Sequence, residues 1–258
     1  DKQLLPTAAA GGCRYGPTPQ LWPADARGAA LEVRVLSYNL FWWNLFDKVK
    51  PPQMQFHLRT PGNTGTQLIE QAVQAQGFDV MGFQECNDEQ WLLQVSGLAE
   101  QYQIFRDKHC CMAYRTASWQ LLDRGVAWVA QDQKYGPRPA QWMRLRHTQT
   151  GKLVFFVNHH GPIPINGGGV CGGASVAYNI LTLVATKAQA GDAVILVGDF
   201  NSDPGSATIR GIESSLHRAY GGGIDFIFSN LEGPALDARS LGNGGSDHAA
   251  ISAALQLP

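Results

Sequence analysis

Hydrophobic and polar positions first follow a regular pattern at residue 31. Residues 31–39 alternate between apolar and polar side chains, which predicts a strand with one buried face. Residues 79–85 are a short apolar run that ends in polar side chains, and residues 193–199 form the most apolar strand-like run of the chain. The same criteria predict strands in the segments 110–114, 119–122, 126–130, 141–146, 153–158, 224–229 and 249–257.

Helical periodicity is less common than strand-like alternation. The predicted helices are 66–76, 89–101 and 174–190. Gly77 ends the first of them, and the Gly- and Pro-rich residues 48–65 and 161–173 predict loops. Residues 1–30 are rich in Ala, Gly and Pro without any period, so we predict an extended N-terminal arm followed by one domain over residues 31–258.

Strands and helices interleave in two successive blocks, and polar residues gather where strands end. Each sheet has to bury an apolar face against another layer. We therefore predict an α/β (α+β) fold, a four-layer sandwich of two packed mixed β-sheets flanked by helices. Loops at one edge of such a sandwich form a cleft suited to function.

Composition excludes only a few classes of function. The 258 residues have a formal net charge of −1, so any binding of nucleic acid has to come from a local patch or a bound metal. No apolar run approaches the roughly 18 residues that a membrane-spanning helix needs. We expect a monomer without a transmembrane segment.

The five cysteines, Cys13, Cys86, Cys110, Cys111 and Cys171, lack the paired spacing of a zinc site. Their odd number leaves at least one free thiol in a monomer, and one or two disulfides or buried free thiols both remain open. Cys110 and Cys111 are expected to face opposite sides of a strand. The cysteines, and a first residue other than Met, are compatible with a secreted protein.

Several strand ends carry side chains that suit neither a core nor an ordinary surface. These are Asn39, Glu85, His159, His160, Asp199, Asn201, Asp225, Asp247 and His248. Taken singly, a strand-end Asn is usually a turn residue and a half-buried Glu is usually in a salt bridge. Asp225 lies among bulky apolar residues, so its carboxylate needs a partner, for which His248 is suited.

If these strand ends converge, their carboxylates need a cation. Two carboxylates about 5 Å apart repel by roughly 3 kcal/mol at an effective dielectric near 20. Ligands dominated by oxygen, without thiolates, favour Mg²⁺, Mn²⁺ or Ca²⁺ over zinc. The residues alone thus predict a hydrolase that uses a hard divalent metal.

The order and spacing of these motifs resemble the endonuclease/exonuclease/phosphatase superfamily, which has a deoxyribonuclease I-like fold. The resemblance covers about residues 31–257. It rests on Tyr38-Asn39, Gln84-Glu85, Asn158-His159-His160, Gly198-Asp199-Phe200-Asn201, Ile224-Asp225-Phe226-Ile227-Phe228 and Ser246-Asp247-His248. It implies a phosphoester substrate and a Mg²⁺ cofactor, with Mn²⁺ or Ca²⁺ as substitutes.

The resemblance also assigns roles to single residues. Asn39 and Glu85 would hold the principal metal, which Asp247 completes or supports. Asp199 and Asn201 would orient or deprotonate the attacking water, while Asp225 and His248 form an acid–imidazole dyad on a phosphate oxygen. His160 would stabilise the pentacovalent phosphorus. Arg138, and more loosely His109, would contact substrate.

Departures from the family pattern leave two questions open. His159 replaces a usual Thr, so His159 remains an alternative to His160 as the active imidazole. Residues 161–186 contain no Lys or Arg, which argues against a deep groove for duplex DNA. The substrate can be DNA, RNA or a small or nucleotide-like phosphodiester.

Other functions stay as alternatives. A phosphomonoesterase is one, and a sphingomyelinase-like lipid phosphodiesterase is another, for which the aromatic residues within 41–46 are the only candidate membrane contact. An inactive binding module would need the motif residues to be lost, and all are present. A serine hydrolase is disfavoured because no G-x-S-x-G motif occurs.

Overall fold

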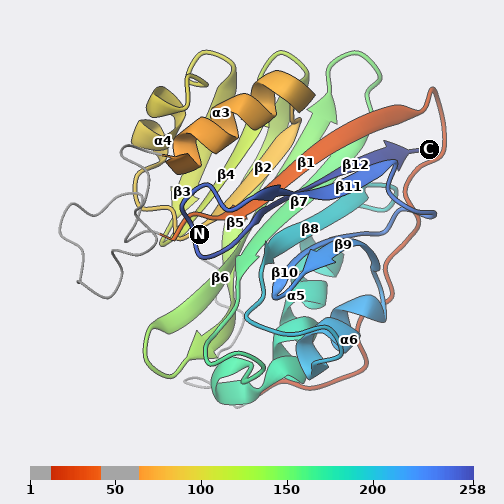
Figure 1. The fold of residues 1–258 in the computed structure, drawn as a ribbon. Coiled ribbons are helices and arrows are strands. Elements are labelled where there is room, and N and C mark those ends of the chain that lie inside the picture. Colours follow the sequence, from red (N-terminus) through yellow and green to blue (C-terminus); the bar gives the residue numbers. More distant parts are fainter. Residues whose placement is uncertain (1–12, 42–63) are drawn as a thin grey trace, which may run out of the picture.

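The computed structural model describes residues 13–41 and 64–258, and its strands form two six-stranded sheets (Figure 1). The first sheet, in spatial order, consists of β11 (Asp237–Gly242), β12 (Ala250–Leu257), β1 (Leu31–Asn39), β2 (Val80–Gln84), β4 (Cys110–Arg115) and β3 (Tyr102–Asp107). The second consists of β5 (Trp119–Asp132), β6 (Gly136–His147), β7 (Leu153–His160), β8 (Ala193–Asp199), β10 (Asp225–Ser229) and β9 (His217–Gly222).

The two sheets pack face to face, with helices on their outer faces. The helices are α3 (Thr64–Gln76) and α4 (Glu89–Val95) on the first sheet, and α5 (Gly173–Lys187) and α6 (Ala207–Glu213) on the second, with a 3-10 turn η2 (Gly169–Cys171) before α5. Val35, Val80, Phe156 and Ile195 belong to the apolar layer between the sheets. This arrangement confirms the predicted four-layer α/β sandwich.

The register of the strands brings their polar ends to one edge of the sandwich. β1 and β2 run parallel with Asn39 beside Gln84, and β7 and β8 run parallel with His160 beside Asp199. β10 runs antiparallel to β8, which places Asp225 beside Asp199. A Cβ added to Gly198 would lie 2.0 Å from the carbonyl oxygen of His159, so the approach of β8 to β7 requires glycine there.

The secondary structure departs from the sequence prediction at several points. The helix predicted to reach residue 101 ends at Val95, since Ser96 caps it and Gly97 takes a positive φ of 67°. The predicted strands 119–122 and 126–130 are one strand, β5, with a register shift after Leu121. The short elements β3, β9, β11 and α6 were not predicted, because exposed polar side chains weaken their alternation or period.

Residues 13–30 contain no helix or strand and lie along the second sheet and its helices. Tyr15 donates a hydrogen bond to the carbonyl of Cys171, and Asn230 donates one to the carbonyl of Trp22. A disulfide joins Cys13 to Cys171. Residues 48–63 of the predicted loop and residues 42–46 of the aromatic segment lie outside the described residues. Thr64 and Gly65, which were predicted to belong to the loop, form the start of α3.

A second disulfide joins Cys86 to Cys111, while Cys110 is buried and free. Cys110 and Cys111 thus have different surroundings, as predicted for neighbours on a strand. Within residues 13–41 and 64–258, no helix is long and apolar enough to cross a membrane.

Candidate functional site

Asp199, the last residue of β8, lies at the centre of a polar cluster. Its side chain is buried, and its Oδ1 accepts a hydrogen bond from the backbone N–H of Asn201 at 2.8 Å. Its Oδ2 accepts one from Asn39 Nδ2 at 2.9 Å. Asn201 has a positive φ of 46° and anchors its own side chain on the carbonyl of Gly161. These hydrogen bonds therefore fix the orientation of the Asp199 carboxylate.

Two imidazoles face the same oxygen of Asp199. His160 Nε2 lies 3.4 Å from Asp199 Oδ2, and His248 Nε2 lies 3.7 Å from it. His248 Nδ1 is 2.8 Å from Asp225 Oδ2, so the acid–imidazole pair expected from burial is present. The adjacent strands β7, β8 and β10 carry His160, Asp199 and Asp225, whereas His248 comes from the loop before β12 of the first sheet.

Asn39 and Glu85 come from the first sheet and complete the cluster across the sandwich. Asn39 Nδ2 lies 3.5 Å from Glu85 Oε1, and Asn39 Oδ1 accepts from the backbone N–H of Phe41 at 2.9 Å. Glu85 follows β2 directly and has a positive φ of 55°. A non-glycine residue in that region is uncommon and is found where the surrounding structure enforces it.

The loop that carries Asp247 and His248 is fastened to β1. Ser246 Oγ donates to the carbonyl of Asn39 at 2.7 Å and accepts from the backbone N–H of His248 at 3.0 Å. Asp247 is exposed, with its Oδ1 4.0 Å from His248 Nε2. The anchoring role of Ser246 was missed from the sequence, although its place next to Asp247 and His248 was the available signal.

His159 points away from the cluster. It is fully buried, its Nδ1 lies 2.8 Å from the carbonyl oxygen of Pro139, and its ring packs against Phe200. Burial lowers the pKa of His159 to about 4. Of the two adjacent imidazoles, His160 is the one that the geometry brings to Asp199.

Burial and neighbouring charges shift the pKa values of the cluster in opposite directions. Burial and the nearby Asp225 raise the pKa of Asp199 to about 6. Burial lowers the pKa of His248, but its hydrogen bond to Asp225 and the charge of Asp199 outweigh that effect and raise it to about 9. Burial, with Arg138 nearby, holds the pKa of His160 well below its usual value.

The residues fit a hard divalent cation. Burial and the nearby carboxylate of Asp225 raise the pKa of Asp199, and a bound cation would stabilise its ionised form. Among the described residues, the titratable donors Asp199, Asp225 and His248 have their ligand atoms within 4.8 Å of one another. Two of the three are already paired with each other, however, and the pKa of His248 favours the imidazolium, which cannot bind a metal. Asn39 and Glu85 offer only oxygen ligands and suit a hard cation better.

Arg138 and His109 lie beside the cluster. Both border a small pocket that also reaches His160, together with Lys108. Arg138 pairs with Asp132 at 3.0 Å, and its Nε has no hydrogen-bond partner within the part of the chain that the structure describes. His109 Nδ1 lies 3.2 Å from the side-chain oxygen of Asn87.

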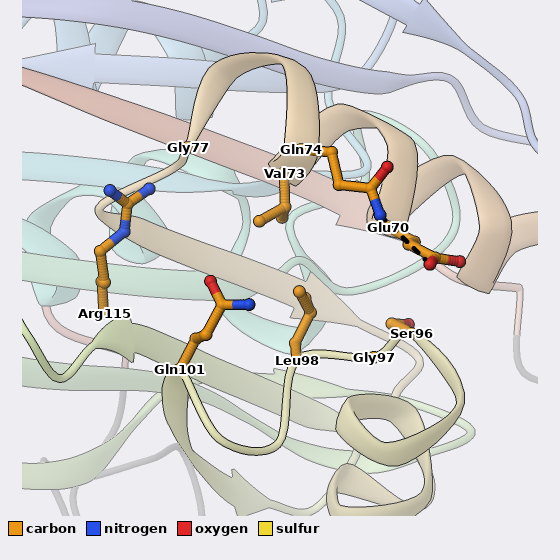
Figure 2. A pocket seen from close by; sticks show the side chains of 9 residues that line it. All are labelled: Glu70, Val73, Gln74, Gly77, Ser96, Gly97, Leu98, Gln101 and Arg115. Atoms are coloured by element: carbon orange, nitrogen blue, oxygen red, sulfur yellow. Dashed lines mark hydrogen bonds between the residues drawn. The ribbon is translucent and has the colours of Figure 1, made fainter.

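A larger hollow of about 280 Å³ lies elsewhere, between α3 and the turn that follows α4 (Figure 2). Its lining residues are Glu70, Val73, Gln74, Gly77, Ser96, Gly97, Leu98, Gln101 and Arg115. None of them belongs to the polar cluster. Arg115 is held there by hydrogen bonds to the carbonyl of Phe78 and the hydroxyl of Tyr102.

Comparison with known protein families defines the class to which this chain belongs. The sequence model of the endonuclease/exonuclease/phosphatase family matches residues 42–248. The chain belongs to this family, as the motifs indicated, and its members are phosphoester hydrolases that generally use divalent metals. No curated protein matches the chain.

Solved structures with the same fold include a family member from Bacteroides thetaiotaomicron, with a TM-score of 0.68, 19% identity, and coverage of 89% of this chain and 99% of that one. A mannosyl-6-phosphatase from the same organism has a TM-score of 0.64, 19% identity, and coverage of 86% and 99%. The human nocturnin catalytic domain with bound sulfate has a TM-score of 0.61, 15% identity, and coverage of 90% and 98%. At these identities the likeness concerns the fold.

Proposed function

We propose that this protein is a divalent-metal-dependent phosphoesterase that hydrolyses phosphodiester bonds by in-line attack of water. The observation that carries the proposal is the set of groups around Asp199 Oδ2. This oxygen accepts from Asn39 Nδ2 at 2.9 Å and lies 3.4 and 3.7 Å from the Nε2 atoms of His160 and His248. Phosphoester hydrolysis needs an oriented water that can lose a proton and donors for the phosphate oxygens. This group of side chains can supply both.

In this proposal Asn39 and Glu85 hold the principal cation and the exposed Asp247 supports it. Mg²⁺ is the expected ion, and Mn²⁺ or Ca²⁺ can substitute for it. The bound cation would neutralise charge on a non-bridging phosphate oxygen. The support is that each residue offers a side-chain oxygen and that the two side chains are neighbours, since Asn39 Nδ2 donates to Glu85 Oε1 at 3.5 Å.

Asp199 orients the attacking water and accepts its proton. A pKa of about 6 suits a general base that works near neutral pH, because the carboxylate is ionised yet basic enough to take a proton. The N–H of Asn201 fixes its second oxygen. His248 is held as an imidazolium by Asp225 and donates to a phosphate oxygen. The imidazole of His160 stays neutral and donates its one N–H to an oxygen on the pentacovalent phosphorus.

The substrate is a phosphodiester in nucleic acid or in a small, nucleotide-like compound. Residues 161–186, which follow His160, contain no Lys or Arg, and a strong duplex nuclease needs several cations along the backbone. The absence of these charges favours a small or single-stranded substrate over duplex DNA.

A phosphomonoesterase is the second candidate. The pocket that Lys108, His109 and Arg138 border beside His160 favours it, because a terminal phosphate carries an extra charge that nearby cations stabilise. The sphingomyelinase-like alternative depends on residues 41–46, of which 42–46 lie outside the described part of the chain. The two disulfides support a location outside the reducing cytosol.

A substrate panel under one metal condition tests these proposals. The panel consists of bis-p-nitrophenyl phosphate, p-nitrophenyl phosphate, single-stranded and plasmid DNA, RNA and sphingomyelin, each with Mg²⁺, with EDTA, and with EDTA followed by excess Mg²⁺. We expect diester hydrolysis that EDTA abolishes and Mg²⁺ restores. Faster hydrolysis of the monoester would select the second candidate, and full activity in EDTA would overturn the metal mechanism.

A further inference from the structure

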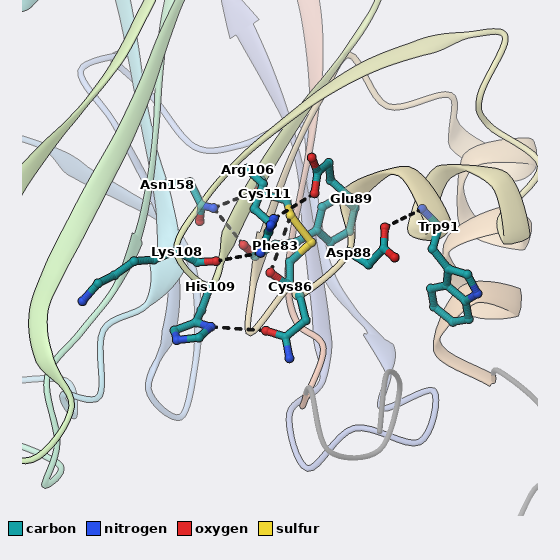
Figure 3. The surroundings of a disulfide bond; sticks show 11 residues. Phe83, Cys86, Asp88, Glu89, Trp91, Arg106, Lys108, His109, Cys111 and Asn158 are labelled. Atoms are coloured by element: carbon teal, nitrogen blue, oxygen red, sulfur yellow. Dashed lines mark hydrogen bonds and ion pairs between the residues drawn. A yellow bond between two sulfur atoms is a disulfide. The ribbon is translucent and has the colours of Figure 1, made fainter. Parts of the chain in front are cut away.

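The disulfide between Cys86 and Cys111 adjoins the proposed metal ligand Glu85. Cys86 is the next residue after Glu85, and Cys111 lies on β4, the strand that pairs with β2. Both cysteines are completely buried. Figure 3 shows the bond within a group of side chains that includes Phe83, His109 and Asn158. The disulfide therefore links the segment that follows β2 to β4, next to the position where Glu85 leaves the sheet.

The backbone is held on both sides of Glu85. On one side, Gln84 pairs with Asn39 and Cys110 in the sheet, and its Nε2 donates to Asn158 Oδ1 at 2.7 Å. On the other side, the backbone N–H of Cys86 donates to the carbonyl of His109 at 2.9 Å. Asn158 Nδ2 in turn donates to the carbonyls of Phe83 and Cys111, at 2.9 and 3.0 Å.

Glu85 needs this restraint more than an ordinary residue does. Its φ of 55° lies in the left-handed region, which side chains other than glycine avoid. A backbone free to relax would return to negative φ and would turn the carboxylate away from Asn39. The hydrogen bond of Cys86 restrains its backbone nitrogen alone. The disulfide, in contrast, restrains the Cα of Cys86 relative to β4.

We propose that the Cys86–Cys111 disulfide is a positioning element for Glu85 and sets the affinity of the cation site. This inference rests on the proposed function, in which Glu85 is a metal ligand. The other disulfide, Cys13–Cys171, joins the N-terminal arm to η2, and neither cysteine is next in sequence to a residue of the cluster, so it provides a matched control.

The test measures the affinity of the protein for a cation and does not depend on hydrolytic activity. The dissociation constant for Mn²⁺ is measured by calorimetry on metal-free wild type, Cys86→Ala/Cys111→Ala and Cys13→Ala/Cys171→Ala. We expect the first double variant to bind Mn²⁺ at least about tenfold more weakly, as is typical when groups that orient a ligand are lost. The control variant should stay within about twofold of wild type, whatever its loss of thermal stability.

A double-mutant cycle separates positioning from general loosening of the fold. In a Glu85→Gln background, removal of Cys86–Cys111 should weaken Mn²⁺ binding by less than about twofold further, because the carboxylate that it positions is gone. A full tenfold loss in that background would overturn the proposal, and so would equal affinity in wild type and Cys86→Ala/Cys111→Ala.

The remaining outcomes are also decisive. If Cys86→Ala/Cys111→Ala does not melt cooperatively, Cys86→Ser/Cys111→Val is used in its place. Failure of both to fold would contradict the proposal, since the disulfide would then support the whole fold. Absence of saturable Mn²⁺ binding in wild type would instead contradict the proposed function itself.

Discussion

His159 and His160 are neighbours on β7 with opposite surroundings, and replacing each by glutamine separates their contributions. His160 faces Asp199 at 3.4 Å, whereas His159 faces the carbonyl of Pro139 within the core. We expect His160→Gln to lower turnover roughly 100- to 1,000-fold, as loss of a donor to a developing oxyanion does. His159→Gln should keep turnover within a few fold at a pH where the variant is folded.

The magnitude of the His159 effect on stability follows from its pKa. Folding lowers this pKa from 6.5 to about 4, because burial penalises the imidazolium. A difference of this size corresponds to about 3 kcal/mol in full. The folded state prefers neutral His159, so the contribution is complete above pH 6.5 and is lost as the pH falls towards 4. About 2 kcal/mol of it should be lost between pH 7.5 and pH 5.

Urea denaturation of metal-free protein at pH 7.5, 6 and 5 measures this effect. Wild type should lose about 2 kcal/mol more on acidification than His159→Gln, while His160, present in both proteins, cancels in the comparison. Equal pH dependence in the two proteins would refute the burial argument. Equal loss of turnover in His159→Gln and His160→Gln, with similar folding, would refute the assignment of His160 to the site.

Three further predictions concern the surroundings of the cluster. Asp225→Asn removes the carboxylate charge that, with its hydrogen bond, helps raise the pKa of His248 to about 9. The alkaline limb of the pH–rate profile should therefore move to lower pH, and an unchanged limb would contradict the dyad. Ser246→Ala loses both the bond to β1 and the bond to the N–H of His248, and should cost about 1–3 kcal/mol in urea denaturation and lower turnover together. Unaltered turnover would show that this anchor is structural. Cys13→Ala/Cys171→Ala opens a crosslink over 158 residues and should lower the free energy of unfolding by roughly 3–5 kcal/mol, with kcat unchanged; a fall in kcat would link the arm to the site.

The sequence was sufficient to predict the fold wherever burial controls the pattern. The strands that carry Asn39 and Asp199 are found within a residue of their predicted bounds, because their apolar faces lie in the core. The pairing of Asp225 with His248 was also predictable, since a carboxylate among Phe and Ile side chains needs a partner. Successive side chains of a strand face opposite sides, so the sequence predicts that only one of His159 and His160 faces the site. In the structure, His160 is the residue that faces Asp199.

Other features depend on contacts that local patterns do not encode. The spacing of five cysteines does not specify which pairs form, because partners such as Cys13 and Cys171 meet only after the chain has folded. Arg138 was assigned to substrate from its motif, and its salt bridge to Asp132 had no signal in the sequence. Roles in catalysis and metal binding remain predictions for all members of the cluster.

The order of the strands has a consequence for biosynthesis. β5 to β10 form the second sheet from one continuous stretch, which is inserted between β4 and β11 of the first sheet. Asp247 and His248 lie between β11 and β12, near the end of the chain. A ribosome-bound chain therefore has an incomplete cluster until residues 247–257 have been synthesised and β12 has paired with β1. Fragments that lack the last strand, whether from truncation or proteolysis, should have no hydrolytic activity of their own.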